Sequence, residues 1–198
     1  MAVNIEEIKR LKELTGVGLT DAKQALEAAN GDFDKALEEM RKKGMTKADK
    51  RGEREARAGV VGNYNHDNRI GVIVEVNCET DFVARNEVFT DFVKDVAMHI
   101  AASNPEFVSA EDIPAEIREA KKAELLTGDA LKGKPAEMAE KIVDGQLGKY
   151  FAERCLLDQP YVKNPDITVG QYVKEHIAKL GENIVVRRFS RIALGEMA

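Results

Sequence analysis

The sequence predicts an α+β protein, with three short N-terminal helices, a basic linker, and a larger helix-rich domain that contains a small antiparallel sheet. Apolar residues recur at helical spacing over most of the chain. Two alternating apolar runs, at 59–64 and 70–76, flank a polar turn typical of a β-hairpin. A third alternating run lies near the C-terminal end, at 184–192. We expect domains at 1–45 and 58–198, joined by a linker at 46–57.

The three N-terminal helices are predicted from apolar stripes that each follow a residue able to cap a helix. The expected caps are Asn4, paired with Glu7 in a capping box, then Thr20 and Asp32. Gly16 and Gly18 break the first helix, and Gly44 is expected to end the third. The side chains expected to face inward are Ile5, Ile8, Leu11, Leu14, Ala22, Ala25, Leu26, Ala29, Phe33, Ala36, Leu37 and Met40. So small a core suits a docking module better than a catalytic domain. Val17 and Leu19, beside the glycines, form either a plug for this core or a surface for a partner.

The segment from Arg41 to Arg57 holds eight basic residues against three acidic ones and has no large apolar residue after Met45. A solvated connector is the simpler interpretation, and contact with RNA is the alternative. The chain as a whole has a net charge of −5, which argues against direct nucleic-acid binding.

The composition is that of a globular protein, with 43% hydrophobic and 33% charged residues. No apolar run approaches the length that spans a bilayer, and the first residues do not resemble a signal peptide. The two cysteines form no disulfide framework and suit a reducing compartment. We therefore expect a cytoplasmic protein without membrane contact.

The larger domain is predicted to contain the hairpin, several helices and a closing strand. The expected helices run over about 86–102, over 114–126, from Pro135 along a stripe that reaches Cys155, and over 171–180. Three strands make a small sheet with two open edges. Such a sheet favours self-association, or a partner that covers it.

The junction at Asn77–Asn86, between the second strand and the first long helix, is the strongest candidate for a functional surface. A carboxylate and a phenyl ring, Asp81 and Phe82, stand side by side there. Thr80 and Asp81 either cap the following helix or face a partner. Phe82 is either a core residue or a probe for another surface, because its position does not match the stripe of the following helix well.

Motifs for chemistry are few. Gly16–Gly18 follows a helix and lacks the lysine spacing of a phosphate-binding loop. Cys78 could form a nucleophile pair with a histidine, although a core thiol is the simpler interpretation. Glu75, Glu79 and Asp81 could be read as a carboxylate metal site only if the strand continued to residue 81. We expect no catalytic residue, no cofactor and no resident metal.

Several separate motifs, in order along nearly the whole chain, resemble the elongation factor Ts family. The most specific is Val76-Asn77-Cys78-Glu79-Thr80-Asp81-Phe82-Val83-Ala84. The segments Leu14–Gly18, Asp21–Lys23 and Ala29–Asp32 are similar to the ubiquitin-associated-like N-terminal domain of that family. The other matches are His99–Ala102, Pro105–Phe107, Gly181–Arg188 and, loosely, Gln159–Val162.

The resemblance implies a guanine-nucleotide exchange factor that binds translation elongation factor Tu, both GDP-bound and nucleotide-free, and performs no bond chemistry. In the family, the Thr-Asp-Phe-Val step enters the partner's nucleotide-binding domain near its Mg²⁺. That step is Thr80, Asp81, Phe82 and Val83 in this chain. The turn formed by Thr15, Gly16, Val17 and Gly18 would dock on the same partner domain.

The chain looks like a short form of the family, with one core half where longer members have two similar halves, a coiled-coil insertion and a C-terminal helical module. Two chains would then pair as a homodimer to rebuild the core. The alternative function is an adaptor whose ubiquitin-associated-like module binds a protein without affecting nucleotide.

Overall fold

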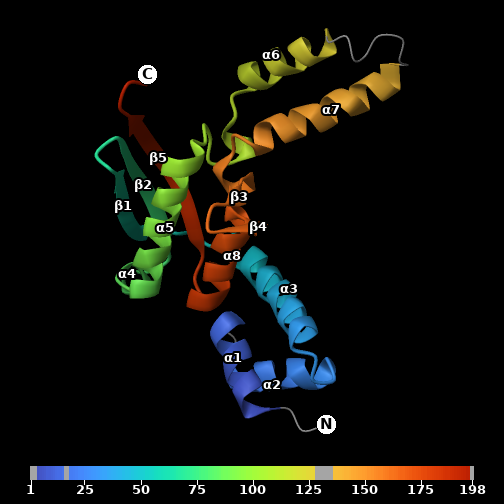
Figure 1. Cartoon of the computed structure of the whole chain (residues 1–198), viewed down its shortest axis with the longest axis vertical. Coiled ribbons are helices and arrows are strands. Elements are labelled where there is room, and N and C mark those ends of the chain that lie inside the picture. The colour runs from blue at the N-terminus through green and yellow to red at the C-terminus, as the bar shows by residue number, and fades with distance from the viewer. Residues whose placement is uncertain (1–3, 16–17, 128–135, 197–198) are drawn as a thin grey trace.

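The computed structural model describes residues 4–15, 18–127 and 136–196 and has a mixed α+β fold. Figure 1 shows three N-terminal helices at one end, a sheet with helices packed on it in the middle, and a projecting pair of helices at the other end. The elements that hold most of the core are a three-stranded sheet and the helices α5 and α8. No helix in the described ranges combines the length and the apolar character that a membrane crossing requires.

The N-terminal part consists of α1 (Ile5–Thr15), α2 (Leu19–Ala28) and the start of α3 (Phe33–Arg51). Its core is small, as predicted, and contains Ile8, Leu11, Ala22, Ala25, Leu26, Ala36 and Met40. Asp32 caps α3, since its carboxylate accepts a hydrogen bond from the Lys35 amide at 3.1 Å. Thr20 does not cap α2: the helix begins at Leu19 with Gly18 as its cap, so Thr20 lies inside it. Ile5 and Leu14, expected to face inward, are exposed.

Helix α3 does not end at Gly44, as predicted, but continues to Arg51. Its C-terminal part packs on α8 (Val169–Leu180), which supplies contacts that outweigh the low helix propensity of glycine. Ala48 is buried there, and an Arg51 guanidinium nitrogen donates to the Ile177 carbonyl at 3.1 Å. The helix crosses the first expected domain limit, so the division into 1–45, 46–57 and 58–198 remains a proposal.

The predicted hairpin is confirmed. Strands β1 (Ala58–His66) and β2 (Ile70–Cys78) pair antiparallel, and β5 (Ile184–Ala193) pairs on the other side of β2, in the order β1-β2-β5. The two residues at the hairpin tip, Asp67 and Asn68, have φ values of 50° and 56°. Positive φ at both central positions is the turn geometry whose twist matches that of paired strands.

One face of the sheet is covered and the other is not. Val72, Val74, Val76 and Cys78 of β2 point to the face on which α5 (Glu87–Ser103) and α8 pack. Asn86 caps α5, and Gly181, at φ 82°, ends α8, close to the predicted limits of both helices. A short two-stranded sheet of β3 (Pro160–Tyr161) and β4 (Asn164–Thr168), which the sequence pattern did not predict, precedes α8.

The projecting hairpin consists of α6 (Ala115–Leu126) and α7 (Ala136–Ala152), near the predicted limits. Two short 3-10 helices, η1 (Ala110–Asp112) and η3 (Leu156–Asp158), lie at its base. Cys155 lies beyond α7 rather than on its stripe, and pairs with Phe107 in an isolated parallel bridge. Helix α6 has no buried residue, so the hairpin contributes little to the main core.

Candidate functional site

The predicted junction is a corner in which the chain turns from a strand into two helices within a few residues. Strand β2 ends at Cys78, and the short helix α4 (Asp81–Ala84) follows at once. The Thr80 hydroxyl accepts a hydrogen bond from the Val83 amide at 3.4 Å, so Thr80, and not Asp81, is the cap of α4. Asn86 then accepts from the Val88 amide at 2.8 Å and begins α5.

The two prominent side chains of the corner point away from the core. Phe82 is 83% exposed, so its interpretation as a core residue is wrong. Asp81 is also exposed, and both residues line an open surface hollow with Arg85 and Asn86. Val83, by contrast, is 6% exposed and packs in the main core. Of the four residues named from the resemblance, Thr80, Asp81 and Phe82 are available at the surface and Val83 anchors them.

A turn from the far end of the chain holds the corner. The Glu182 carboxylate accepts hydrogen bonds from the Glu79 amide at 3.1 Å, the Thr80 amide at 3.0 Å and the Thr80 hydroxyl at 2.6 Å. In return, the Asn183 amide donates to the Glu79 carboxylate at 2.6 Å. These contacts join segments that are about one hundred residues apart in sequence.

The predicted docking turn is described only in part. Thr15 is the last residue of α1 and donates its hydroxyl to the Leu11 carbonyl at 2.6 Å, while Gly18 caps α2. Gly16 and Val17 lie outside the described residues. Leu14 and Leu19, which flank the turn, are 54% and 52% exposed. Leu19 is therefore not a plug for the small core.

The thiol groups lie in the core. Cys78 and Cys155 are both fully buried, and burial raises the pKa of Cys78 to about 11. A nucleophilic cysteine requires a lowered pKa and access to substrate. The hydrolase interpretation of Cys78 is therefore not supported.

The histidines that could have paired with a nucleophilic Cys78 divide between surface and core. His66 is exposed in the hairpin, whereas His99 is fully buried, with Nε2 3.0 Å from the Gln159 side-chain oxygen and Nδ1 accepting from the Val162 amide at 3.2 Å. Burial lowers the pKa of His99 and of His176. A histidine held neutral and satisfied on both nitrogens is a structural residue.

The carboxylates considered as a metal site do not converge. Glu75 pairs with Arg188 at 2.8 Å, Glu79 accepts from Asn183, and Asp81 faces solvent. In the part of the chain that the structure describes, no group of three His, Cys, Asp or Glu residues is arranged to hold a metal ion.

The comparisons with known proteins decide the family. The model of the family described as "Elongation factor TS" matches residues 2–196. Elongation factor Ts of Thermodesulfovibrio yellowstonii is 48% identical over 99% of this chain and 98% of its own length. The factors of Carboxydothermus hydrogenoformans and Alkaliphilus oremlandii are 53% and 51% identical, over 90% and 91% of their own lengths. The chain belongs to the elongation factor Ts family. It is thus an elongation factor of protein biosynthesis.

The largest feature that sequence reasoning missed in this elongation factor Ts family member is the bonding of Glu182. Gly181–Asn183 was expected to end a helix, and it does, but nothing in its pattern indicates which segment Glu182 contacts. The only signal is that both segments belong to motifs of the family resemblance.

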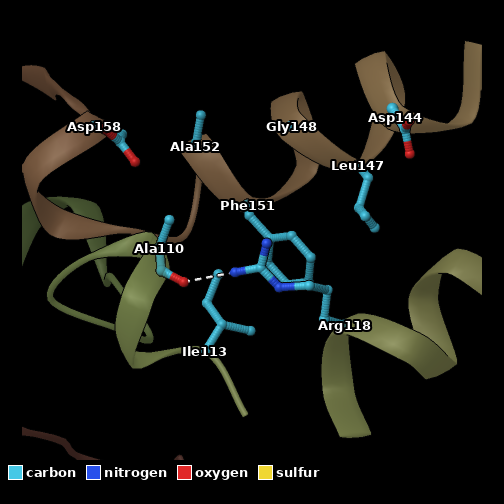
Figure 2. A pocket seen from close by; sticks show the side chains of 9 residues that line it. All are labelled: Ala110, Ile113, Arg118, Asp144, Leu147, Gly148, Phe151, Ala152 and Asp158. Carbon is cyan, nitrogen blue, oxygen red and sulfur yellow. Dashed lines mark hydrogen bonds between the residues drawn. The ribbon is translucent and has the colours of Figure 1, made fainter. Parts of the chain in front are cut away.

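A second unpredicted feature is a pocket of about 270 Å³ at the base of the α6–α7 hairpin. Its lining residues are Ala110, Ile113, Arg118, Asp144, Leu147, Gly148, Phe151, Ala152 and Asp158. Figure 2 shows the Arg118 guanidinium reaching into this pocket, where it donates to the Ala110 carbonyl at 2.7 Å and lies over the Phe151 ring. The pocket is thus partly filled by a side chain of the protein, and its lining offers no nucleophile beside a base.

Proposed function

We propose that this protein is a guanine-nucleotide exchange factor, which binds elongation factor Tu with GDP and promotes the release of GDP. The observation that carries the proposal is the exposed Phe82 ring on a corner whose backbone is fixed from both sides. An apolar ring that is left in solvent on a rigid support suits insertion into a partner. The chain performs no bond chemistry in this proposal and needs no cofactor of its own.

The physical basis is differential binding. GDP on such a partner is held by backbone amides, a lysine and Mg²⁺ at the phosphates. A phenyl ring gains roughly 1.5–3 kcal/mol when it is buried. If Phe82 is buried only in a conformation of the partner that disturbs the Mg²⁺ and phosphate site, it stabilises that conformation. The partner then binds GDP more weakly. By linkage, GDP weakens the binding of the factor to the partner by the same free energy, so the factor binds the nucleotide-free partner best.

The N-terminal helices supply the second contact in this proposal. The exposed Leu14 and Leu19 lie on either side of the turn made by Thr15, Gly16, Val17 and Gly18. We assign this surface, which resembles a ubiquitin-associated domain, to docking on the same partner domain. Docking there would bring the corner to the nucleotide site.

We also propose that two copies form a homodimer through the uncovered face of the sheet. Val61, Ile73 and Ile192, one from each strand, are 67%, 57% and 74% exposed. The strand register places them diagonally across this face, because Val61 is opposite Glu75, and Ile192 is opposite Gly71. The Glu75–Arg188 pair on the same face neutralises its own charges. When a second copy of this face packs against the first, one apolar stripe meets another and no like charges oppose each other.

The test of exchange is the release of fluorescent GDP from elongation factor Tu, timed with buffer, with the protein and with Phe82→Ala. Fast release with the native protein and slow release with Phe82→Ala would support the exchange proposal and the role of the ring. Equal acceleration by both proteins would support the exchange function but exclude a role for the Phe82 ring. Binding without acceleration by either would leave the adaptor function, and a cytoplasmic location fits both functions.

A further inference from the structure

The Gly181–Asn183 turn, between α8 and β5, contacts both the corner that carries Phe82 and the C-terminal end of α3. Glu182 is partly exposed, and its carboxylate accepts the three hydrogen bonds from Glu79 and Thr80 described above. Among the described residues, no other side chain from outside the corner is hydrogen-bonded to Thr80. Thr80 in turn caps the short helix that carries Phe82.

The neighbouring residue extends the contact to the end of the N-terminal helices. Asn183 is 2% exposed, and its side-chain amide donates to the carbonyls of Gly52 and Arg54 at 3.2 and 2.6 Å. Gly52 is the C-cap of α3. Arg54 also lies 3.6 Å from the Glu79 carboxylate. One turn therefore bonds to the corner with one side chain and to the end of α3 with the next.

We propose that Glu182 is a positioning residue for nucleotide exchange, which sets the direction in which the α4 corner presents Phe82. Asn183 keeps the end of α3 against the same turn, so the docking surface and the Phe82 ring stay at a fixed separation. This inference rests on the proposed exchange function. It concerns the rate at which a bound partner loses GDP, and not the strength of binding.

The physical argument is that the corner's own residues fix its C-terminal end but not its N-terminal end. Val83 and Ala84 are buried, but Thr80, Asp81 and Phe82 are exposed and make few contacts with the core. Hydrogen bonds to an ionised acceptor are among the stronger ones in proteins. Without Glu182, water can replace it at Thr80, so the fold survives while α4 samples other directions. If the ring then fails to reach the place where it is buried, the factor loses the contribution of that burial, which is worth roughly 10-fold to 100-fold in rate.

Glu182→Ala and Glu182→Gln test the role, with Glu196→Ala as the matched control. Glu196 is another surface carboxylate with hydrogen-bonded partners, but it pairs with Arg191, at 2.7 Å, at the opposite end of β5. We expect Glu182→Ala to lower the maximal rate of GDP release from saturated elongation factor Tu by roughly 10-fold to 100-fold, the range that burial of the ring can contribute. The half-saturating concentration should change by less than about 3-fold. Gln should restore most of the rate, because its oxygen can accept the two amides while its nitrogen donates to the Thr80 hydroxyl.

A double-mutant cycle with Phe82→Ala separates positioning from general damage. If Glu182 acts through the ring, then adding Glu182→Ala to Phe82→Ala should cause no further loss of rate. An equal loss in both backgrounds, or a large loss of melting temperature in Glu182→Ala alone, would overturn the inference.

A readout without the partner keeps this result distinct from a failure of the exchange proposal. The chain has no tryptophan, so Phe82→Trp places a single tryptophan, which can be excited apart from the tyrosines, at the corner. We expect Glu182→Ala, but not Glu196→Ala, to increase the amplitude of fast anisotropy decay at this position. Unchanged decay would overturn the positioning role even if the protein accelerates GDP release. A larger amplitude in Glu182→Ala, together with no GDP release by the native protein, would reject the exchange function but not the role of Glu182 in fixing the corner.

Discussion

Phe82 and Val83 are consecutive residues of one short helix, yet the first side chain is 83% exposed and the second is 6% exposed. The two positions should therefore respond to truncation in opposite ways. Phe82→Ala should change the free energy of unfolding by less than about 0.5 kcal/mol, since surface truncations remove few contacts. Val83→Ala should lower it by roughly 1.5–3 kcal/mol, because it removes buried methyl groups and leaves a cavity.

Urea denaturation of both variants measures this difference, and the GDP-release assay gives the complementary result. Loss of exchange is expected in Phe82→Ala at full stability. If Phe82→Ala were instead as destabilised as Val83→Ala, the ring would be part of the core and the surface role would be lost.

Gly59 and Gly145 should also respond oppositely to alanine. Gly59 has φ +144°, and a Cβ atom there would collide with the Val76 carbonyl on the paired strand. Gly145 lies in α7 with nothing within 4 Å of an added Cβ. We expect Gly59→Ala to destabilise the protein by about 2 kcal/mol or more. Gly145→Ala should stabilise it by about 0.5–1 kcal/mol, measured by the same denaturation curves.

The sheet face should control self-association. Ile73→Lys places a charge in the centre of the stripe Val61–Ile73–Ile192 and should weaken the proposed dimer by at least about 10-fold. Light scattering of the native protein at micromolar concentration should give twice the 21.9 kDa chain mass, and the variant should give a lower value. Ile117→Lys, at a 44% exposed position on α6, is the control and should stay dimeric. A native monomer would remove the proposal.

Stability should fall below neutral pH because His99 is buried in its neutral form. Burial holds its pKa below the usual 6.5, and its Nδ1 accepts from the Val162 N–H, which cannot accept a hydrogen bond from a protonated ring. The unfolded state therefore binds a proton that the native state does not, so stability is fully present above about pH 6.5 and declines as pH falls. His176 is shifted in the same direction.

Denaturation midpoints between about pH 7.5 and pH 5.5 test this dependence. His99→Gln should flatten the slope by at most about 1.4 kcal/mol per pH unit, and His176 should keep part of it. A slope that is equally steep in the variant would assign the dependence to other groups.

The Cys78 thiol should be inert in the folded protein. With a pKa of about 11 and no exposed surface, it should react with a thiol reagent about 100-fold more slowly than in urea. Cys78→Ser should retain GDP release, because its hydroxyl can donate to the Thr80 carbonyl, as the Sγ atom does at 3.2 Å. Lost activity in a folded Cys78→Ser protein would reopen the nucleophile interpretation.

Local pattern was sufficient to predict the elements whose signals are local. The hairpin followed from the polar turn between two alternating apolar runs, and α5 followed from its apolar stripe, whereas its cap at Asn86 was not predicted. The direction of Phe82 was not predictable in this way. The four-residue helix α4 lies between β2 and α5. Neither the alternation of the strand nor the apolar stripe of α5 therefore indicates which way the side chains of α4 point.

Errors arose where distant contacts override local preference. Gly44 was expected to end α3, but the packing of Ala48 and Arg51 against the α8 side of the core extends the helix. The contact of Glu182 with Thr80 spans 102 residues, and no spacing rule reaches that far. Sequence reasoning thus selected Asp81 and Phe82 as candidates, whereas the exposure of Phe82 and the residue that supports the corner came from the structure alone.

The unbroken course of α3 from Phe33 to Arg51 bears on how the two proposed partner contacts, at the docking turn and at Phe82, would combine. A flexible tether lets the second contact form at an effective concentration that depends only on tether length. A helix instead gives avidity only to partners whose two sites match its length and angle. One inserted residue would turn the preceding helices by about 100° and move them by about 1.5 Å. If both proposed contacts form, their spacing, more than the strength of either, would then select the partner.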